Sequence, residues 1–152
     1  MLPMPGDLRH ILEELTGRPV SLTLARPLAP TQARLTTGVY TDSRLATAAV
    51  VLMDRPAAAR LAACAGSFPA GVAADAIAAQ HVPPLLLPPL NKVFEGLTAL
   101  FPRQRLTLYA LQPGGDAPTD VLAMAAAAGR RLDVTIAVRT YGVGRVSVVL
   151  AR

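Results

Sequence analysis

The segment from Pro88 to Phe101 constrains the fold most, because a strict helical pattern and a polar side coincide there. Its apolar residues recur at intervals of three and four and fall on one stripe of a helix: Leu90, Val93, Phe94, Leu97, Leu100 and Phe101. Its polar residues fall on the opposite side: Asn91, Lys92, Glu95 and Thr98. The leading proline pair suits a first helical turn, where a missing N–H has no consequence. We expect a helix over residues 88–101 that buries the apolar stripe and exposes the polar side.

The remaining chain has the pattern of a mixed protein. Helical patterns cover residues 8–16, 56–65, 71–80 and 116–128, and strand patterns cover residues 20–24, 34–41, 45–53, 106–111, 132–140 and 145–150. Asp7 is the expected N-cap of the first helix, and Gly142 and Gly144 suit a hairpin turn between the last two strands. Residues 85–87 fit either a helical turn or an extended connector. We expect an α/β (α+β) sandwich, with helices packed on one largely antiparallel sheet of about six strands.

Composition sets the class of protein. A chain of 152 residues fits one domain, and a hydrophobic fraction of 52% with only 4% aromatic residues predicts an aliphatic core. The first residues lack the basic and apolar regions of a signal peptide, and no apolar run approaches the roughly 20 residues of a membrane-spanning helix. We therefore expect a single cytoplasmic domain over residues 1–152, with no membrane partner.

The net charge of +5 comes almost entirely from arginine, since Lys92 is the only lysine. Arginines are spread along the chain, with short groups at Arg103/Arg105 and Arg130/Arg131. A basic nucleic-acid-binding module remains an alternative function. The dispersed arginines and scarce aromatic residues argue against it, because such modules usually cluster both.

The inventory of reactive residues is short. His10, His81 and Cys64 are too few and too far apart in the sequence to form a recognisable metal or nucleophile motif. Gly142-Val143-Gly144 lacks the third glycine of a dinucleotide fingerprint, and Gly114-Gly115 lacks the lysine of a P-loop. We therefore expect no cofactor, and the polar side of the 88–101 helix is the best candidate site.

That helix and the order of elements around it resemble the CheC/CheX/FliY family of chemotaxis phosphatases. In that family a Glu-x-x-Asn pair lies on the exposed side of a comparable helix. The glutamate pairs with a lysine of a phosphorylated receiver protein, and the asparagine amide orients the water that attacks the aspartyl phosphate. The resemblance implies a CheX/CheC-like α/β fold and a receiver domain or another signalling protein as partner. Any divalent metal would belong to that receiver.

The motif is degenerate in this chain. One alignment places Lys92 at the glutamate position and Glu95 at the asparagine position, and both charges are then wrong for the reaction. The alternative alignment places Glu95 at the glutamate position and Thr98 at the asparagine position. It restores the carboxylate but replaces the amide with a hydroxyl.

Three interpretations follow from this helix. The leading one is a non-catalytic adaptor or regulatory domain of a receiver-based signalling or motility system that binds through Asn91, Lys92, Glu95 and Thr98. The second is an aspartyl-phosphate phosphatase in which Glu95 and Thr98 are catalytic. The third is an ordinary solvated helix side with an ion pair between Lys92 and Glu95. The alanine-rich helices, in addition, offer flat surfaces on which a homodimer could form.

Overall fold

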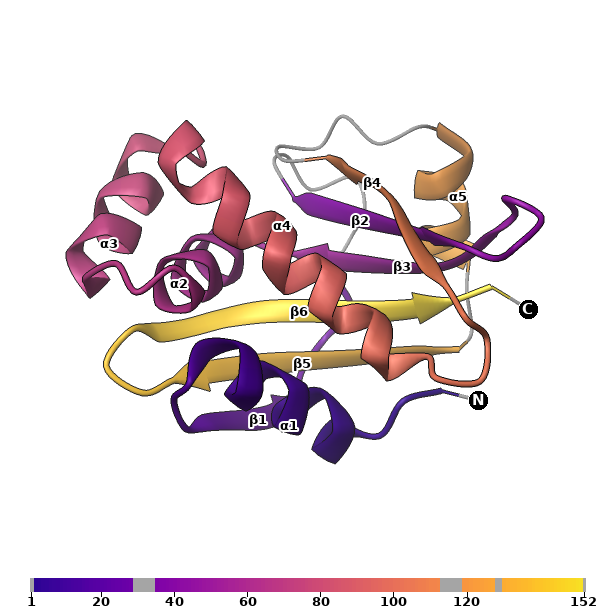
Figure 1. The fold of residues 1–152 in the computed structure, drawn as a ribbon, viewed down its shortest axis with the longest axis horizontal. Coiled ribbons are helices and arrows are strands. Elements are labelled where there is room, and N and C mark those ends of the chain that lie inside the picture. The colour runs from indigo at the N-terminus through magenta and orange to yellow at the C-terminus, as the bar shows by residue number, and fades with distance from the viewer. Residues whose placement is uncertain (1, 29–34, 113–118, 128–129, 152) are drawn as a thin grey trace.

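One antiparallel sheet organises the molecule (Figure 1). The structure is a computed structural model that describes residues 2–28, 35–112, 119–127 and 130–151. The strands are β1 (Val20–Leu24), β2 (Thr36–Thr41), β3 (Thr47–Met53), β4 (Thr107–Gln112), β5 (Arg131–Val138) and β6 (Gly142–Leu150). Their order across the sheet is β1-β5-β6-β3-β2-β4, and every neighbouring pair is antiparallel. The predicted α/β sandwich with one antiparallel sheet is confirmed.

Helices cover both faces of this sheet. The helical elements are α1 (Pro5–Thr16), α2 (Arg55–Ala65), α3 (Ala70–Ala79), the 3-10 helix η1 (Pro84–Leu86), α4 (Leu87–Gly96), the 3-10 helix η2 (Leu97–Leu100) and α5 (Thr119–Ala127). Figure 1 shows α1, α2 and α4 in front of the sheet and α5 behind it. In β3, Val51 and Met53 join the front core, whereas Val50 and Leu52 join a smaller cluster with Val121 of α5. Covering both faces explains why β3 is apolar at every position from Ala48 to Met53.

The central helix forms as its apolar stripe predicts. Leu90, Val93, Phe94 and Leu97 are fully buried, and Leu100 and Phe101 are 5% and 2% exposed. The ambiguous residues before it form η1, which runs directly into α4. The α-helix ends at Gly96, earlier than predicted, and continues as η2. Gly96 lies against α1, where a Cβ would come within 2.6 Å of a Leu15 methyl group.

A glycine in β2 sets how deeply α4 packs. The Phe94 ring lies over Gly38, where a Cβ would be 2.3 Å from the ring. The Tyr40 hydroxyl donates a hydrogen bond of 2.6 Å to the carbonyl oxygen of Phe94. Burial raises the pKa of Tyr40 far above its ordinary value, so the phenol stays protonated as a donor. These contacts fix the register of α4 on the sheet.

Two local predictions were wrong. Asp7 is not the N-cap of α1, because the helix begins earlier, at Pro5, with Met4 at the N-cap position. The Asp7 carboxylate instead accepts a hydrogen bond of 3.1 Å from the Met4 backbone N–H, which is the reciprocal half of a capping box. The β5–β6 turn also falls before the predicted glycines, and Tyr141 N–H closes it onto the carbonyl of Val138 at 3.0 Å.

The glycine at position 144 serves helix packing rather than the turn. It lies within β6, and a Cβ there would be 2.4 Å from both the Cα and the backbone nitrogen of Ala57 in α2. Helix α2 therefore contacts the bare backbone of the strand. Further along, the Arg60 guanidinium donates to the carbonyl of Val143, which ties the same helix to the start of β6.

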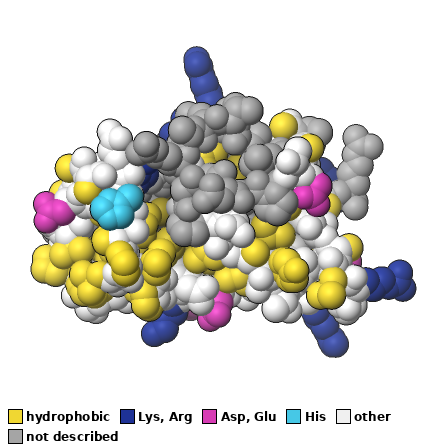
Figure 2. Space-filling model, turned by 90° about the horizontal axis from the view of Figure 1, so that it is seen from above, with side chains coloured by type: hydrophobic (Ala, Val, Ile, Leu, Met, Phe, Trp, Pro, Cys, Tyr) yellow, Lys and Arg dark blue, Asp and Glu magenta, His cyan; other side chains and the backbone are white. Residues whose placement is uncertain are grey.

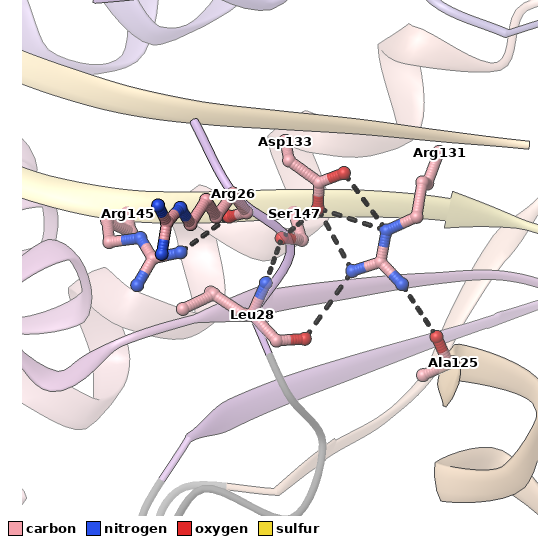
Figure 3. A network of polar contacts seen from close by, with 7 residues as sticks. All are labelled: Arg26, Leu28, Ala125, Arg131, Asp133, Arg145 and Ser147. Carbon is pink, nitrogen blue, oxygen red and sulfur yellow. Dashed lines mark hydrogen bonds and ion pairs between the residues drawn. The ribbon is translucent and has the colours of Figure 1, made fainter. Parts of the chain in front are cut away.

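A network of polar contacts stabilises the rear face of the sheet, where α5 packs (Figure 3). Arg131 forms an ion pair with Asp133, and their side chains are only 14% and 10% exposed. The same guanidinium donates to the carbonyls of Ala125 in α5 and Leu28 after β1, at 2.8 and 3.4 Å. Ser147 donates to Asp133 at 2.5 Å and accepts from the Leu28 N–H at 3.3 Å. The network thus connects α5, the segment after β1, and strands β5 and β6.

Surface residues are unevenly distributed (Figure 2). Apolar side chains gather toward the end of the molecule that carries α3 and η1, where Leu85 is 55% exposed. On this side of the molecule the Lys and Arg side chains stand apart from one another, in keeping with their spread along the sequence. The exposed alanines of α3 (Ala74, Ala78 and Ala79) belong to the flat surfaces suggested for self-association. Homodimerisation stays a prediction.

Candidate functional site

The polar side of α4 is open to solvent. Asn91, Lys92 and Glu95 are exposed, and Thr98, one turn further in η2, is partly buried. In Figure 1 the helix runs diagonally across the front of the sheet. Because the buried stripe faces the sheet, the four predicted residues share the outward side of one continuous helical segment.

Hydrogen bonds within the helix order these side chains. The Asn91 amide donates to the Glu95 carboxylate, with 3.1 Å between Nδ2 and Oε1. The Thr98 hydroxyl donates to the backbone carbonyl of Glu95 at 2.6 Å. The expected Lys92–Glu95 ion pair is absent between these two described residues, because Glu95 turns toward Asn91 on the preceding turn of the helix. Within the described part of the chain, Lys92 has no ion pair.

This geometry limits the chemistry that each residue can perform. The Thr98 proton is engaged in the helix, so its hydroxyl oxygen is left to accept hydrogen bonds rather than to donate one. The amide of Asn91 lies beside the carboxylate of Glu95, but it precedes that carboxylate by four residues instead of following it by three. The site offers one cation, one anion and one amide, a set suited to binding a complementary charged surface.

The described residues contain no cluster of metal-ligating side chains. Within them no group of three or more His, Cys, Asp or Glu side chains gathers where it could hold a metal ion. The helices that the structure describes are all too short or too polar to cross a membrane.

One polar cavity was not predicted from the sequence. It lies away from α4 and is lined by Arg18 and Arg139, which come from opposite ends of the chain. Only the pairing of β1 with β5 brings them together, and no local motif marks either residue.

Comparison with known proteins finds solved structures of similar fold. No family model matches the sequence, and no curated protein sequence matches it. A chain in the crystal structure of the FliM–SpeE complex from H. pylori matches with a TM-score of 0.64 and 8% identity, over 95% of this chain and 80% of that one. The FliM middle domain from H. pylori matches with a TM-score of 0.59 and 9% identity, over 95% of this chain and 83% of that one.

Thermotoga maritima FliY has a similar structure, with a TM-score of 0.55 and 11% identity over 96% of this chain and 83% of that one. The chain has a CheC/CheX/FliY-like fold. The resemblance drawn from the sequence is thereby confirmed for the fold. At 8 to 11% identity the likeness extends to the fold alone, so the roles of Glu95 and Thr98 in this CheC/CheX/FliY-like domain stay predictions.

Proposed function

We propose that this CheC/CheX/FliY-like domain is a non-catalytic adaptor or regulatory domain of a receiver-based signalling or chemotaxis system. Its contact surface is the outward side of α4 and η2, formed by Asn91, Lys92, Glu95 and Thr98. The observation that supports the proposal is the arrangement of the polar side chains on this surface. Its carboxylate and amide are exposed and pre-ordered, yet they stand in the wrong order for a Glu-x-x-Asn pair, and Lys92 occupies the other candidate glutamate position.

Binding requires less of these residues than catalysis does. An aspartyl-phosphate phosphatase needs a group that positions the attacking water beside the phosphoryl group, and Thr98 offers there a hydroxyl already bonded to the Glu95 carbonyl at 2.6 Å instead of an amide. Recognition needs only complementary charge on a rigid element, which an exposed Lys92 and a held Glu95 provide. The FliM–SpeE complex supports the proposal, because it involves protein–protein association by a chain of similar fold.

Charge reversal on α4 tests this surface. Lys92→Glu and Glu95→Lys should each weaken receiver binding about tenfold or more, because each places a like charge against the partner. The measurement is calorimetric titration with receiver domains from the same genome, each with and without a phosphoryl mimic. Glu14→Lys is the matched control, since Glu14 is an exposed carboxylate on α1 whose side chain is 68% exposed. Receiver binding that both α4 variants leave unchanged would place the interface elsewhere, and no binding to any receiver would refute the adaptor.

The second candidate is a phosphatase, favoured by one observation: the Thr98 hydroxyl lies next to Glu95 on the outward side of the helix and bonds its backbone carbonyl at 2.6 Å. In that case Glu95 and Thr98 would act with a divalent metal held by the partner receiver. Phosphate release from a phosphorylated receiver should then exceed the receiver's own rate, and Glu95→Ala should abolish the excess while Glu14→Ala retains it. Equal release with wild type and with Glu95→Ala would eliminate this candidate.

A further inference from the structure

A polar cavity opens at the end of the sheet where β5 turns into β6. Its volume is about 580 Å³, and its lining includes Arg18, Cys64, Ser67, Arg139, Thr140 and Tyr141. The described lining contains two arginines and no Asp or Glu. It is therefore a basic site, separate from the polar side of α4.

Strand pairing builds the basic lining. Val20 of β1 pairs with Val138 of β5, and the backbone N–H of Arg139 donates to the carbonyl of Pro19 at 3.1 Å. This backbone contact brings Arg18 and Arg139 to the same rim. Within the described residues, neither arginine has a carboxylate partner within ion-pair distance. Two guanidinium groups thus line one cavity without a neutralising carboxylate.

Aromatic packing orders one of these groups. The Arg18 guanidinium lies 5.3 Å from the centroid of the Tyr141 ring, and the Tyr141 hydroxyl donates to the carbonyl of Phe68 at 2.5 Å. The ring is therefore anchored, and the Arg18 charge lies over its face. One side-chain hydrogen bond joins Arg18 to Cys64, and the other N–H groups of the guanidinium can bind a planar or tetrahedral oxyanion.

The other lining groups are compatible with a bound anion. Burial raises the pKa of the Cys64 thiol despite the opposing effect of Arg18, so the sulfur carries no charge at neutral pH. The last-turn carbonyls of α1 and α2 face this end, but Gly17 and Gly66 donate back to them and satisfy part of their hydrogen bonding. Their residual partial charges are smaller than those of two guanidinium groups.

Backbone geometry at the rim is unusual. Ser67 and Thr140 both adopt left-handed conformations, with φ of 60° and 75°. For a β-branched residue such as Thr140 this is uncommon, and residues held this way concentrate at binding sites. Both residues line the cavity, and their hydroxyls can add hydrogen-bond donors to those of the two arginines.

We propose that this cavity binds a phosphate group, either as free inorganic phosphate or as the monoester of a small metabolite. Arg18 and Arg139 supply charged donors, and Ser67 and Thr140 supply hydroxyl donors. The cavity exceeds the size of a single phosphate ion, which leaves room for the organic part of a monoester. The site binds without covalent chemistry, and it is independent of the partner surface on α4.

The test is a titration of the ¹⁵N-labelled protein followed by amide chemical shifts. One arm uses sodium phosphate and a second uses glycerol 3-phosphate, each balanced with sodium chloride to constant ionic strength. We expect saturable shifts in both arms at Gly17, Arg18 and Thr140. Tighter binding of glycerol 3-phosphate would identify the monoester as the preferred form, and equal binding would identify phosphate itself. Shifts that rise linearly, or that sodium chloride alone reproduces, would overturn the site.

Matched arginine variants localise the effect. Arg139→Gln should weaken phosphate binding about tenfold, and it keeps the backbone N–H that bonds Pro19. Arg18→Lys keeps the charge but loses the planar guanidinium over Tyr141, so it should weaken phosphate binding less than Arg139→Gln does. It serves as a second variant if Arg139→Gln fails to fold. Arg44→Gln, an exposed arginine in the β2–β3 turn, should bind as wild type does. An equal loss of affinity in the Arg44 and Arg139 variants would refute the assignment.

Discussion

Replacing Asp133 by alanine should lower the free energy of unfolding by about 3 kcal/mol, because it leaves the Arg131 guanidinium without its counter-ion in a largely buried position. The change also removes the acceptor of the Ser147 hydroxyl, whose hydrogen bond to Asp133 is 2.5 Å long. Chemical denaturation followed by circular dichroism measures this loss. Asp75→Ala is the control, since Asp75 is exposed on α3 and its removal should change stability by less than about 0.5 kcal/mol.

A double variant separates the cost of an unpaired charge from the value of the pair. Arg131→Met combined with Asp133→Leu removes both charges and fills similar volume, so it should destabilise the protein less than Asp133→Ala alone. A double variant that costs as much as Asp133→Ala would mean that the ion pair itself, rather than the avoidance of a lone charge, stabilises the rear of the sheet.

Replacing Gly144 by alanine should have an effect of similar size. The added methyl group would lie 2.4 Å from the Cα and nitrogen of Ala57, and helix backbone cannot rotate away as a side chain can. Helix α2 must then shift from the sheet, at a cost of about 3 kcal/mol, measurable as a lower denaturation midpoint. Gly71→Ala is the matched control, because a methyl group added there would have nothing within 4 Å, and a helical alanine should leave stability unchanged or higher. Equal stability of the two variants would contradict the close contact of α2 with β6.

The sequence predicted those features that depend on neighbouring residues. The stripe from Leu90 to Phe101 identified α4 and its exposed side correctly, because helical periodicity depends only on local spacing. The fold followed from the alternation of helical and strand patterns together with the family resemblance. The 3-10 continuation after Gly96 was missed, since it accompanies packing against Leu15 on a helix some eighty residues earlier in the chain.

Long-range contacts account for the other differences. Gly144 has turn composition, yet its use depends on how closely Ala57 approaches, which no local pattern encodes. Asp133 lies within the predicted strand over residues 132–140 and Arg131 just before it, and the connection of Arg131 to Leu28 exists only once the chain has folded. The exposure of the polar side of α4 was predicted correctly, but the pairing of Glu95 with Asn91 rather than Lys92 depends on side-chain orientation.

The position of β6 in the sheet also governs how the domain can assemble. This strand follows the other five along the chain, yet it lies between β5 and β3 and joins the β1–β5 pair to the β3-β2-β4 group. Until the ribosome has released the chain through Leu150, the two groups have no strand to connect them. The sheet therefore closes only after its other strands have emerged, and before then the nascent chain carries the unpaired inner edges of β3 and β5 as sites for mispairing.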